Sequence, residues 1–140
     1  MTDYLSVIDV LAIHTDQIER YGGSHGIRDA GLLEAALYRP QTGYYEDLLA
    51  EAAALWESLS QNHPFIDGNK RTAFACAFTF LFINSLRLTA SADKTWRFLH
   101  GHYEKGTLSF KVLEKWIRDN TEAVRDGPAN SGTTISEFAP

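Results

Sequence analysis

The sequence has few cysteines and few basic residues. It holds one cysteine among 140 residues, which excludes an internal disulfide framework and a cysteine-rich zinc module. Lysine and arginine number 13 against 18 aspartates and glutamates, for a formal net charge of −5. Because nucleic-acid-binding proteins are usually basic, this balance argues against direct binding to nucleic acid. It does not exclude a local basic patch.

Targeting and membrane segments are also missing. The amino terminus, Met1–Tyr4, lacks the basic region and the apolar run of a secretory signal. The longest uncharged apolar stretch, Thr72–Leu86, is too short to cross a bilayer and suits a buried core helix. Hydrophobic residues make up 44% of the chain and charged residues 22%, which is close to the globular average and argues against whole-chain disorder. We expect a soluble, cytoplasmic protein without membrane contact.

Strand patterns and internal repeats are scarce as well. Few runs alternate between apolar and polar residues, and no convincing strand is found. Apolar residues instead recur at helical spacing, between cap residues such as Ser6 and stop residues such as Gly22. The pattern predicts an all-α, single-domain bundle of about six helices, over about 7–21, 30–38, 46–62, 69–85, 92–103 and 110–123.

Two regions stand apart from the amphipathic helices. The helix over 69–85 is apolar nearly all round, which is typical of a helix buried on every side, so we expect it at the centre of the fold. Residues 126–140 consist mainly of small and turn-forming types, and we predict a disordered tail there. The predicted domain therefore covers residues 1–125.

The densest polar segment of the chain leads into the central helix. It reads His-Pro-Phe-Ile-Asp-Gly-Asn-Lys-Arg-Thr, from His63 to Thr72. A helix amino terminus attracts anions, because its first N–H groups are unpaired and the helix dipole is positive there. Gly68 would let a ligand approach the backbone closely. Lys70 and Arg71 oppose the dipole in the first turn, a cost that a bound phosphate would offset.

Two further side chains of this segment suit chemistry on a phosphate. His63 can take a proton from a hydroxyl near neutral pH. Asp67 is the kind of carboxylate that holds Mg²⁺ beside phosphates. Together these residue types are the equipment of phosphoryl or nucleotidyl transfer. The alternative interpretation is a polar interhelix loop with a hydrogen-bonded histidine and two solvated basic residues.

The segment His63–Arg71 resembles the core motif of the Fic/Doc superfamily, His-x-Phe-x-Asp-(Ala/Gly)-Asn-(Lys/Gly)-Arg. The upstream runs Tyr21–Gly23 and Gly26–Leu37 are similar to the death-on-curing (Doc) branch of that superfamily. The resemblance covers about residues 4–120. It implies a Fic/Doc-like helical bundle in which the motif opens a buried central helix.

The residue at position 70 separates the two branches. AMP-transferring Fic enzymes carry Gly there and a second Arg three residues after the first, whereas this chain has Lys70 and Phe74. Both differences resemble Doc. The resemblance implies a toxin kinase that transfers the γ-phosphate of ATP to a threonine of elongation factor Tu and so arrests translation. It also implies Mg²⁺ as cofactor and a Phd-type antitoxin as partner.

The resemblance assigns a role to each residue of the motif. His63 would be the base that takes the hydroxyl proton, and Asp67 would hold Mg²⁺ or orient the base and substrate. Gly68 and Asn69 would contact phosphate through backbone and amide groups. Lys70 and Arg71 would neutralise the β- and γ-phosphates. The predicted catalytic set is His63, Asp67, Lys70 and Arg71, and the predicted nucleotide-binding set is Gly68, Asn69, Lys70 and Arg71.

Outside these sets most candidate residues favour a structural role. The resemblance implies that Phe65 points inward and anchors the loop. His14 is interpreted first as a core histidine bonded to a neighbour, and second as a support for the site. Arg28 and Asp29 are interpreted as a surface pair and a helix cap, with a nucleotide role as the alternative. The remaining expectations are core packing for Trp56, Trp96 and Trp116, an inert buried thiol for Cys76, and surface positions for His25, His100 and His102.

Three functions stay open at this point. The first is a Doc-type protein kinase that acts on a translation factor. The second is transfer of AMP or another nucleoside monophosphate to a protein hydroxyl, against which Lys70 argues. The third is a non-catalytic module that binds a nucleotide or a partner, and His63 and Asp67 argue against it because binding alone needs neither.

Overall fold

The computed structural model describes residues 1–124, so the tail predicted over 126–140 lies outside the described residues. Six α-helices, one 3₁₀ helix and two short strands follow one another within this part of the chain. The helices are α1 (Val7–Tyr21), α2 (Ala30–Tyr38), α3 (Leu48–Asn62), α4 (Asn69–Ile83), α5 (Ala92–Lys105) and α6 (Phe110–Asp119), with η1 (Arg39–Thr42) after α2 and the strands β1 (Leu86–Leu88) and β2 (Thr121–Ala123). The predicted all-α, single-domain helical bundle is confirmed.

Short-range signals set most of the helix starts. The side chains of Ser6, Asp29, Asp47, Ser91 and Ser109 each accept a hydrogen bond from a backbone N–H in the first turn of the helix that follows. Such caps satisfy donors that the helix itself leaves unpaired. The cap at Asp47 starts the third helix slightly later than predicted, because the cap residue itself stays extended.

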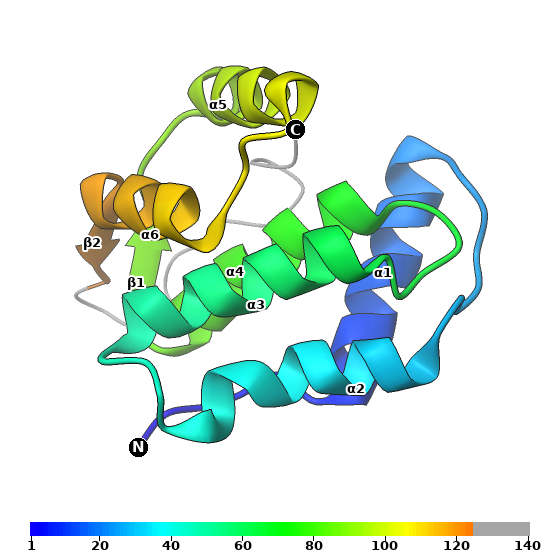
Figure 1. Ribbon diagram of the computed structural model, residues 1–140, viewed down its shortest axis with the longest axis horizontal. Helices are drawn as coiled ribbons and strands as arrows, with labels where there is room; N and C mark the ends of the chain where they lie inside the picture. Colours follow the sequence, from blue (N-terminus) through cyan, green and yellow to red (C-terminus); the bar gives the residue numbers. More distant parts are fainter. Residues whose placement is uncertain (125–140) are drawn as a thin grey trace.

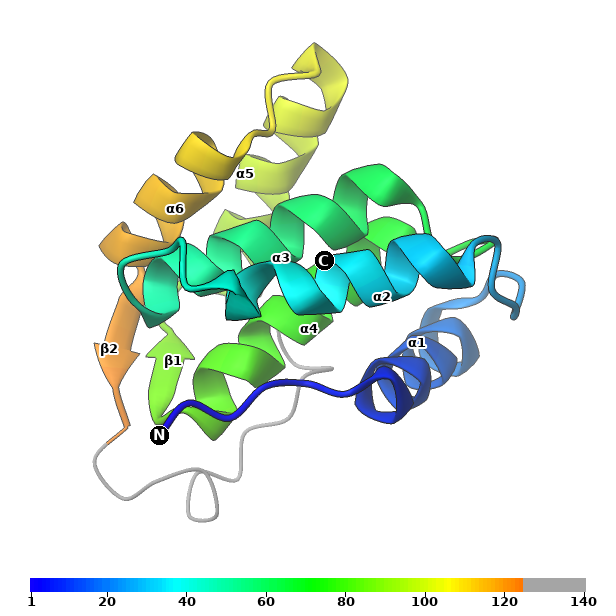
Figure 2. The same cartoon turned by 60° about the horizontal axis from the view of Figure 1, so that its bottom comes forward.

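Helices α3 and α4 form the centre of the fold. They run side by side in opposite directions, with α2 and α1 on one side and α5 and α6 on the other (Figures 1 and 2). Helix α4 is buried over most of its length, from Thr72 to Phe78 and again at Phe80 and Leu81. This agrees with a helix that lacks a polar face. The loop between α3 and α4 therefore lies at one end of the core. One side of the loop packs on the helices, and its other side faces solvent.

The small antiparallel sheet was not predicted. β1 pairs with β2, with Leu86 opposite Ala123 and Leu88 opposite Thr121. Three-residue strands are too short to show a period of two in the sequence. The same pairing corrects the predicted end of the last helix, which stops at Asp119 rather than near 123. The Asn120 side chain donates to the Trp116 carbonyl at 2.8 Å and so closes the helix end.

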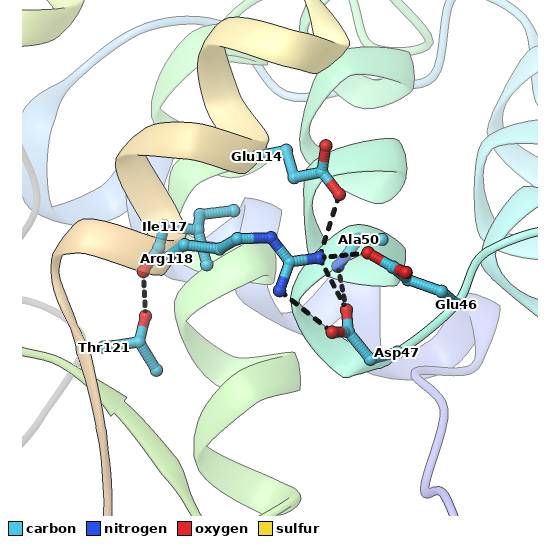
Figure 3. Close-up of polar contacts among 7 residues, drawn as sticks. All are labelled: Glu46, Asp47, Ala50, Glu114, Ile117, Arg118 and Thr121. Carbon is cyan, nitrogen blue, oxygen red and sulfur yellow. Dashed lines mark hydrogen bonds and ion pairs between the residues drawn. The ribbon is translucent and has the colours of Figure 1, made fainter.

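Helix α6 is fastened to the start of α3 by one arginine. The Arg118 guanidinium bonds both carboxylate oxygens of Asp47, at 2.9 and 3.1 Å, and also reaches Glu46 and Glu114 at 3.0 Å each (Figure 3). Hydrogen bonding to Arg118 lowers the pKa of Asp47, and the same pairing raises the pKa of Arg118. The network joins two elements that are far apart in the sequence and lies outside the α3–α4 loop.

Among residues 1–124, no helix is long and apolar enough to cross a membrane.

Candidate functional site

The predicted motif lines one pocket. Its volume is about 540 Å³, and it lies between the α3–α4 loop and helix α5. The structure brings together at this pocket all six predicted site residues, His63, Asp67, Gly68, Asn69, Lys70 and Arg71. Four residues of α5 form the opposite wall, Trp96, Leu99, His100 and Tyr103. A pocket of this size suits a small-molecule ligand or cofactor.

The two ends of the motif loop have left-handed backbone. His63 follows the last residue of α3 with φ of 49°, and Gly68 precedes α4 with φ of 73°. Gly68 has no side chain to cap α4, and no side-chain cap bond is formed there. The first N–H groups of α4 are thus available to an anion in the pocket. The backbone conformation is compatible with the predicted anion site, which stays a prediction.

The segment 22–29 holds the motif loop from one side. Arg28 donates from Nε to the His63 carbonyl at 2.6 Å and from Nη2 to the Asn62 carbonyl at 2.7 Å. The Arg28 and Asp29 backbone N–H groups both donate to the Pro64 carbonyl. A guanidinium suits this place because the carbonyl end of α3 is negative. Arg28 therefore clamps the loop, which corrects its interpretation as half of a surface pair, while Asp29 caps α2 as predicted.

Helix α1 holds the loop from beneath through His14. The His14 ring is buried and stacks on Phe65, with 3.8 Å between ring centroids. His14 Nε2 lies 2.8 Å from the Asp67 carbonyl oxygen and donates to it. Burial lowers the pKa of His14, which keeps the ring neutral. The predicted histidine bonded to a neighbour is confirmed, and because the neighbour is the motif loop, His14 also supports the site. The inward position of Phe65 is confirmed too, since it is 1% exposed.

The Asp67 carboxylate faces the pocket and is held by backbone. Its Oδ2 accepts from the Ser24 N–H at 3.1 Å, and its Oδ1 accepts from the Gly68 N–H at 2.8 Å. These bonds lower the pKa of Asp67, the bond from Ser24 most, so the group is ionised at neutral pH. Each oxygen keeps further acceptor capacity. Asp67 is therefore oriented and charged, as a ligand of a divalent cation needs to be.

The described residues offer no complete protein cage for a metal. Within residues 1–124, no group of three or more His, Cys, Asp or Glu side chains is arranged so that it could hold a metal ion. Mg²⁺ commonly binds through one or two carboxylates together with substrate phosphates and water. The Asp67 carboxylate beside the start of α4 fits that mode, in which a nucleotide supplies the other oxygens.

Asn69 is engaged inside the loop. Its amide Nδ2 donates to the Phe65 carbonyl at 2.9 Å, and its Oδ1 accepts from the Phe65 N–H at 2.9 Å. Both ends of the amide thus brace the turn. The contact of the side-chain amide with phosphate stays a prediction. The Asn69 backbone N–H lies in the first turn of α4 and is not used in bracing the loop.

The two cations of the first turn are held apart from each other. Lys70 Nζ lies over the Tyr103 ring, 4.5 Å from its centroid. Arg71 Nη2 donates to the Gly22 carbonyl at 2.8 Å, and its guanidinium lies over the Tyr21 ring. Lys70 thus approaches the pocket from the α5 side and Arg71 from the α1 side. A ligand at the start of α4 would lie between the two charges.

Sequence reasoning missed the contribution of α5. Trp96 was expected in the core, but it is 49% exposed and lines the pocket. His100 is exposed, as expected, but it also lines the pocket beside Trp96, with 5.0 Å between ring centroids. Helical spacing groups Trp96 with Leu99 and Tyr103 but does not say whether that face meets the core or a pocket. The expectations for Trp56, Trp116 and Cys76 are confirmed, since all three are buried, and burial raises the pKa of the Cys76 thiol.

Comparisons with known proteins agree with this site. A family model described as "Fic/DOC family" matches residues 4–81, which is more than half of the chain. The match includes α1, the segment 22–29, the motif loop and most of α4. The chain belongs to the Fic/DOC family.

Two relatives place it in the Doc branch. The chain is 50% identical over 98 residues to "Toxin Doc" of Mycolicibacterium smegmatis, and this match covers 66% of the chain and 73% of that protein. It is 35% identical over 94 residues to "Protein kinase doc" of Escherichia phage P1, and this match covers 64% of the chain and 75% of that protein. The Doc resemblance is thereby confirmed.

Proposed function

We propose that this chain is a Doc-type toxin that transfers the γ-phosphate of ATP to a hydroxyl group of a cytoplasmic translation factor. The relatives named as a toxin and as a protein kinase support this proposal. The observation that carries it is the arrangement at the start of α4. An uncapped helix end, two flanking cations and an exposed histidine surround one pocket.

The free side chain of His63 supports a role as general base. Its backbone carbonyl is fixed by Arg28, but the side chain is exposed at the pocket. In the proposed reaction His63 takes the proton of the target hydroxyl while the hydroxyl oxygen forms a bond to the γ-phosphorus. The bond from that phosphorus to the β–γ bridging oxygen breaks, and ADP leaves. A positioned base typically contributes about 10²–10⁴-fold to such a rate.

The cations and Asp67 supply the electrostatic part. Lys70 and Arg71 would neutralise charge on the β- and γ-phosphates from opposite sides of the pocket. Asp67 would hold Mg²⁺, which would supply positive charge beside the phosphates. The bonds from Ser24 and Gly68 keep the Asp67 carboxylate in place for that role.

Lys70 favours γ-phosphate transfer over nucleotidyl transfer. Its ammonium group fills space beside the α4 terminus that Gly would leave open, and Tyr103 holds it there. The triphosphate would therefore lie differently, and the Doc resemblance implies a placement with the γ-phosphate at the reacting end. Transfer of AMP is the second candidate function, and the remaining alternative is a binding module without catalysis.

The target and the partner rest on the Doc resemblance. We propose a threonine of elongation factor Tu as the acceptor and a Phd-type antitoxin as the inhibitor. The name "Toxin Doc" of the mycobacterial relative supports an antitoxin partner, because such toxins must be silenced in their host.

The test is a labelling assay with the purified protein, Mg²⁺ and either γ-labelled or α-labelled ATP. Purified elongation factor Tu is the first substrate, and a bacterial lysate is the second. The proposal expects label from γ only, on one dominant band. Label from α would establish nucleotidyl transfer instead. No label with either substrate would leave a non-catalytic binding module as the remaining function.

The control variant must respect the backbone at position 63. Because His63 has φ of 49°, alanine would be strained there, whereas asparagine adopts this conformation more readily. His63→Asn should keep the fold and nucleotide binding and lower γ-transfer by about 10²–10⁴-fold. Unchanged transfer in this variant would remove His63 from the mechanism.

A further inference from the structure

Trp96 is an exposed tryptophan at the edge of the candidate site. It is 49% exposed, whereas Trp56 is 0% and Trp116 is 8% exposed. Large aromatic side chains are usually highly buried, so an indole that is exposed next to a pocket indicates a role in ligand binding. His100 lies one turn further along α5, with a tilt of 31° between the rings, and the two rings form one aromatic surface.

This surface belongs to the same pocket as the anion site. The pocket is bounded by Trp96, Leu99 and His100 on α5 and by the start of α4 on the other side. Leu99 is 1% exposed and adds an apolar side chain to the lining of the pocket. One end of the pocket is thus suited to phosphates, and the other end is suited to a flat, apolar group. A nucleoside triphosphate has these two parts at its two ends.

The aromatic surface also has room for a flat group. The pocket that this surface lines has a volume of about 540 Å³, and helix α5 is fastened to the rest of the protein through side chains other than Trp96. Phe98 stacks on Trp116 at 4.7 Å, and Tyr103 Oη is 2.9 Å from Ser60 Oγ. Lys94 Nζ donates to Asn120 Oδ1 at 2.8 Å. The helix is thus fixed through other side chains, while Trp96 is left to face the pocket.

We infer that Trp96, together with His100, is the platform on which the base of the nucleotide stacks. The inference rests on the proposed function only in placing the phosphates at the start of α4. Stacking on an aromatic face tolerates different bases, because every base has a π-face. We therefore expect Trp96 to add affinity for nucleoside triphosphates and none for inorganic triphosphate.

The experiment compares ATP with inorganic tripolyphosphate on three proteins, in the presence of Mg²⁺. Binding is measured by calorimetry on the wild type, on Trp96→Leu and on Trp96→Phe. Loss of one base–aromatic stack should weaken ATP binding of Trp96→Leu by about tenfold, within a range of about 5- to 150-fold. Phenylalanine should restore part of this loss, and tripolyphosphate should bind all three proteins equally.

A matched control comes from α2. Tyr38 is 65% exposed, more than Trp96, and it is not among the residues that line the pocket. Tyr38→Leu should bind both ligands as the wild type does. Quenching of tryptophan fluorescence by ATP gives a second measure, because Trp56 and Trp116 are buried and only Trp96 of the three is exposed. The quench should disappear in Trp96→Leu.

The outcomes separate this inference from the proposed function. Unchanged ATP affinity in Trp96→Leu would overturn the platform, even if γ-label still reached a protein target. Equal loss of ATP and tripolyphosphate affinity would also overturn it, since the variant would then have disturbed the anion site. Selective loss of ATP affinity would support the platform, even if no phosphate were transferred.

Discussion

The His14 ring lies flat against the ring of Phe65, with 3.8 Å between centroids and 5° between planes. One residue comes from the first helix and the other from the motif loop. The same His14 donates through Nε2 to the Asp67 carbonyl at 2.8 Å. A single buried side chain therefore fixes both the apolar anchor of the loop and the backbone of its carboxylate residue.

Removal of His14 should destabilise the protein and loosen the site. In His14→Ala the Asp67 carbonyl loses its donor and the Phe65 ring loses its stacking partner. We expect a loss of about 1–3 kcal/mol in the free energy of unfolding, measured by urea denaturation. His25→Ala is the matched control, because His25 lies exposed on the neighbouring segment 22–29. Equal stability of the two variants would contradict the bracing role of His14.

The lowered pKa of His14 makes stability depend on pH. Below the ordinary value of 6.5, the unfolded chain takes up a proton that the folded protein resists, because burial disfavours the charged ring. Stability should therefore fall as the pH falls from 6.5 toward the lowered pKa, and this contribution should be constant above 6.5. Unfolding at a series of pH values checks this, and His14→Gln should remove the slope in that window. If stability still depended on pH in this window in the variant, the dependence would belong to another titrating group.

The sequence predicted the helices well and the contacts between them poorly. Helix bounds depend on near neighbours, such as the bond from the Asp9 N–H to Ser6 or the left-handed glycine after Lys105. The contact of His14 with Asp67 spans 53 residues, and no local pattern encodes it. The clamp from Arg28 to His63 spans 35 residues in the same way.

The motif residues were predicted because chemistry and helix position coincide in one short segment. The α5 wall of the pocket was not predicted, because an aromatic residue at helical spacing is as consistent with a core position as with a pocket position. Trp96 and Trp116 show the difference, as one is 49% and the other 8% exposed. Only the packing of α5 against the rest of the chain decides which face of that helix meets the pocket.

Lys70 should set the position of the triphosphate. Lys70→Gly removes the ammonium group held over Tyr103 and opens space at the start of α4. We expect weaker γ-transfer and some transfer of AMP, read from γ- and α-labelled ATP in parallel. Lys70→Arg, which keeps the charge, is the comparison. Unchanged γ-transfer in the glycine variant would remove Lys70 from the argument for a kinase.

Arg118 should contribute to stability in a salt-dependent way. It bonds Asp47, the residue that caps α3, and two further carboxylates (Figure 3). Arg118→Gln should cost about 1 kcal/mol at low salt and less at high salt, because the groups are partly exposed. Arg97→Gln is the control, since the Arg97–Asp93 pair is more than 70% exposed on both sides and should contribute almost nothing. Equal effects of the two variants would contradict a network held by Arg118.

Gly23 should matter to the site through the space that it leaves for Asp67. A Cβ at Gly23 would lie 2.7 Å from Asp67 Oδ2 and 3.2 Å from its Cγ, so the carboxylate would have to move. Gly22 provides a matched control, because its φ of 87° is also positive but a Cβ there would meet nothing within 4 Å. Both alanine variants carry backbone strain, because φ is positive at both positions, and this strain should cost each about 1–3 kcal/mol of stability.

The two glycine variants should differ in the site rather than in the backbone. Gly23→Ala alone displaces the Asp67 carboxylate and the Ser24 bond that holds it. We expect Gly23→Ala to weaken Mg²⁺-dependent ATP binding and γ-transfer by at least about tenfold relative to Gly22→Ala, by analogy with the loss of groups that orient a metal ligand. Calorimetry with and without Mg²⁺ gives the first reading and the labelling assay gives the second. Equal binding and equal transfer in the two variants would show that the placement of the Asp67 carboxylate is not what the site requires.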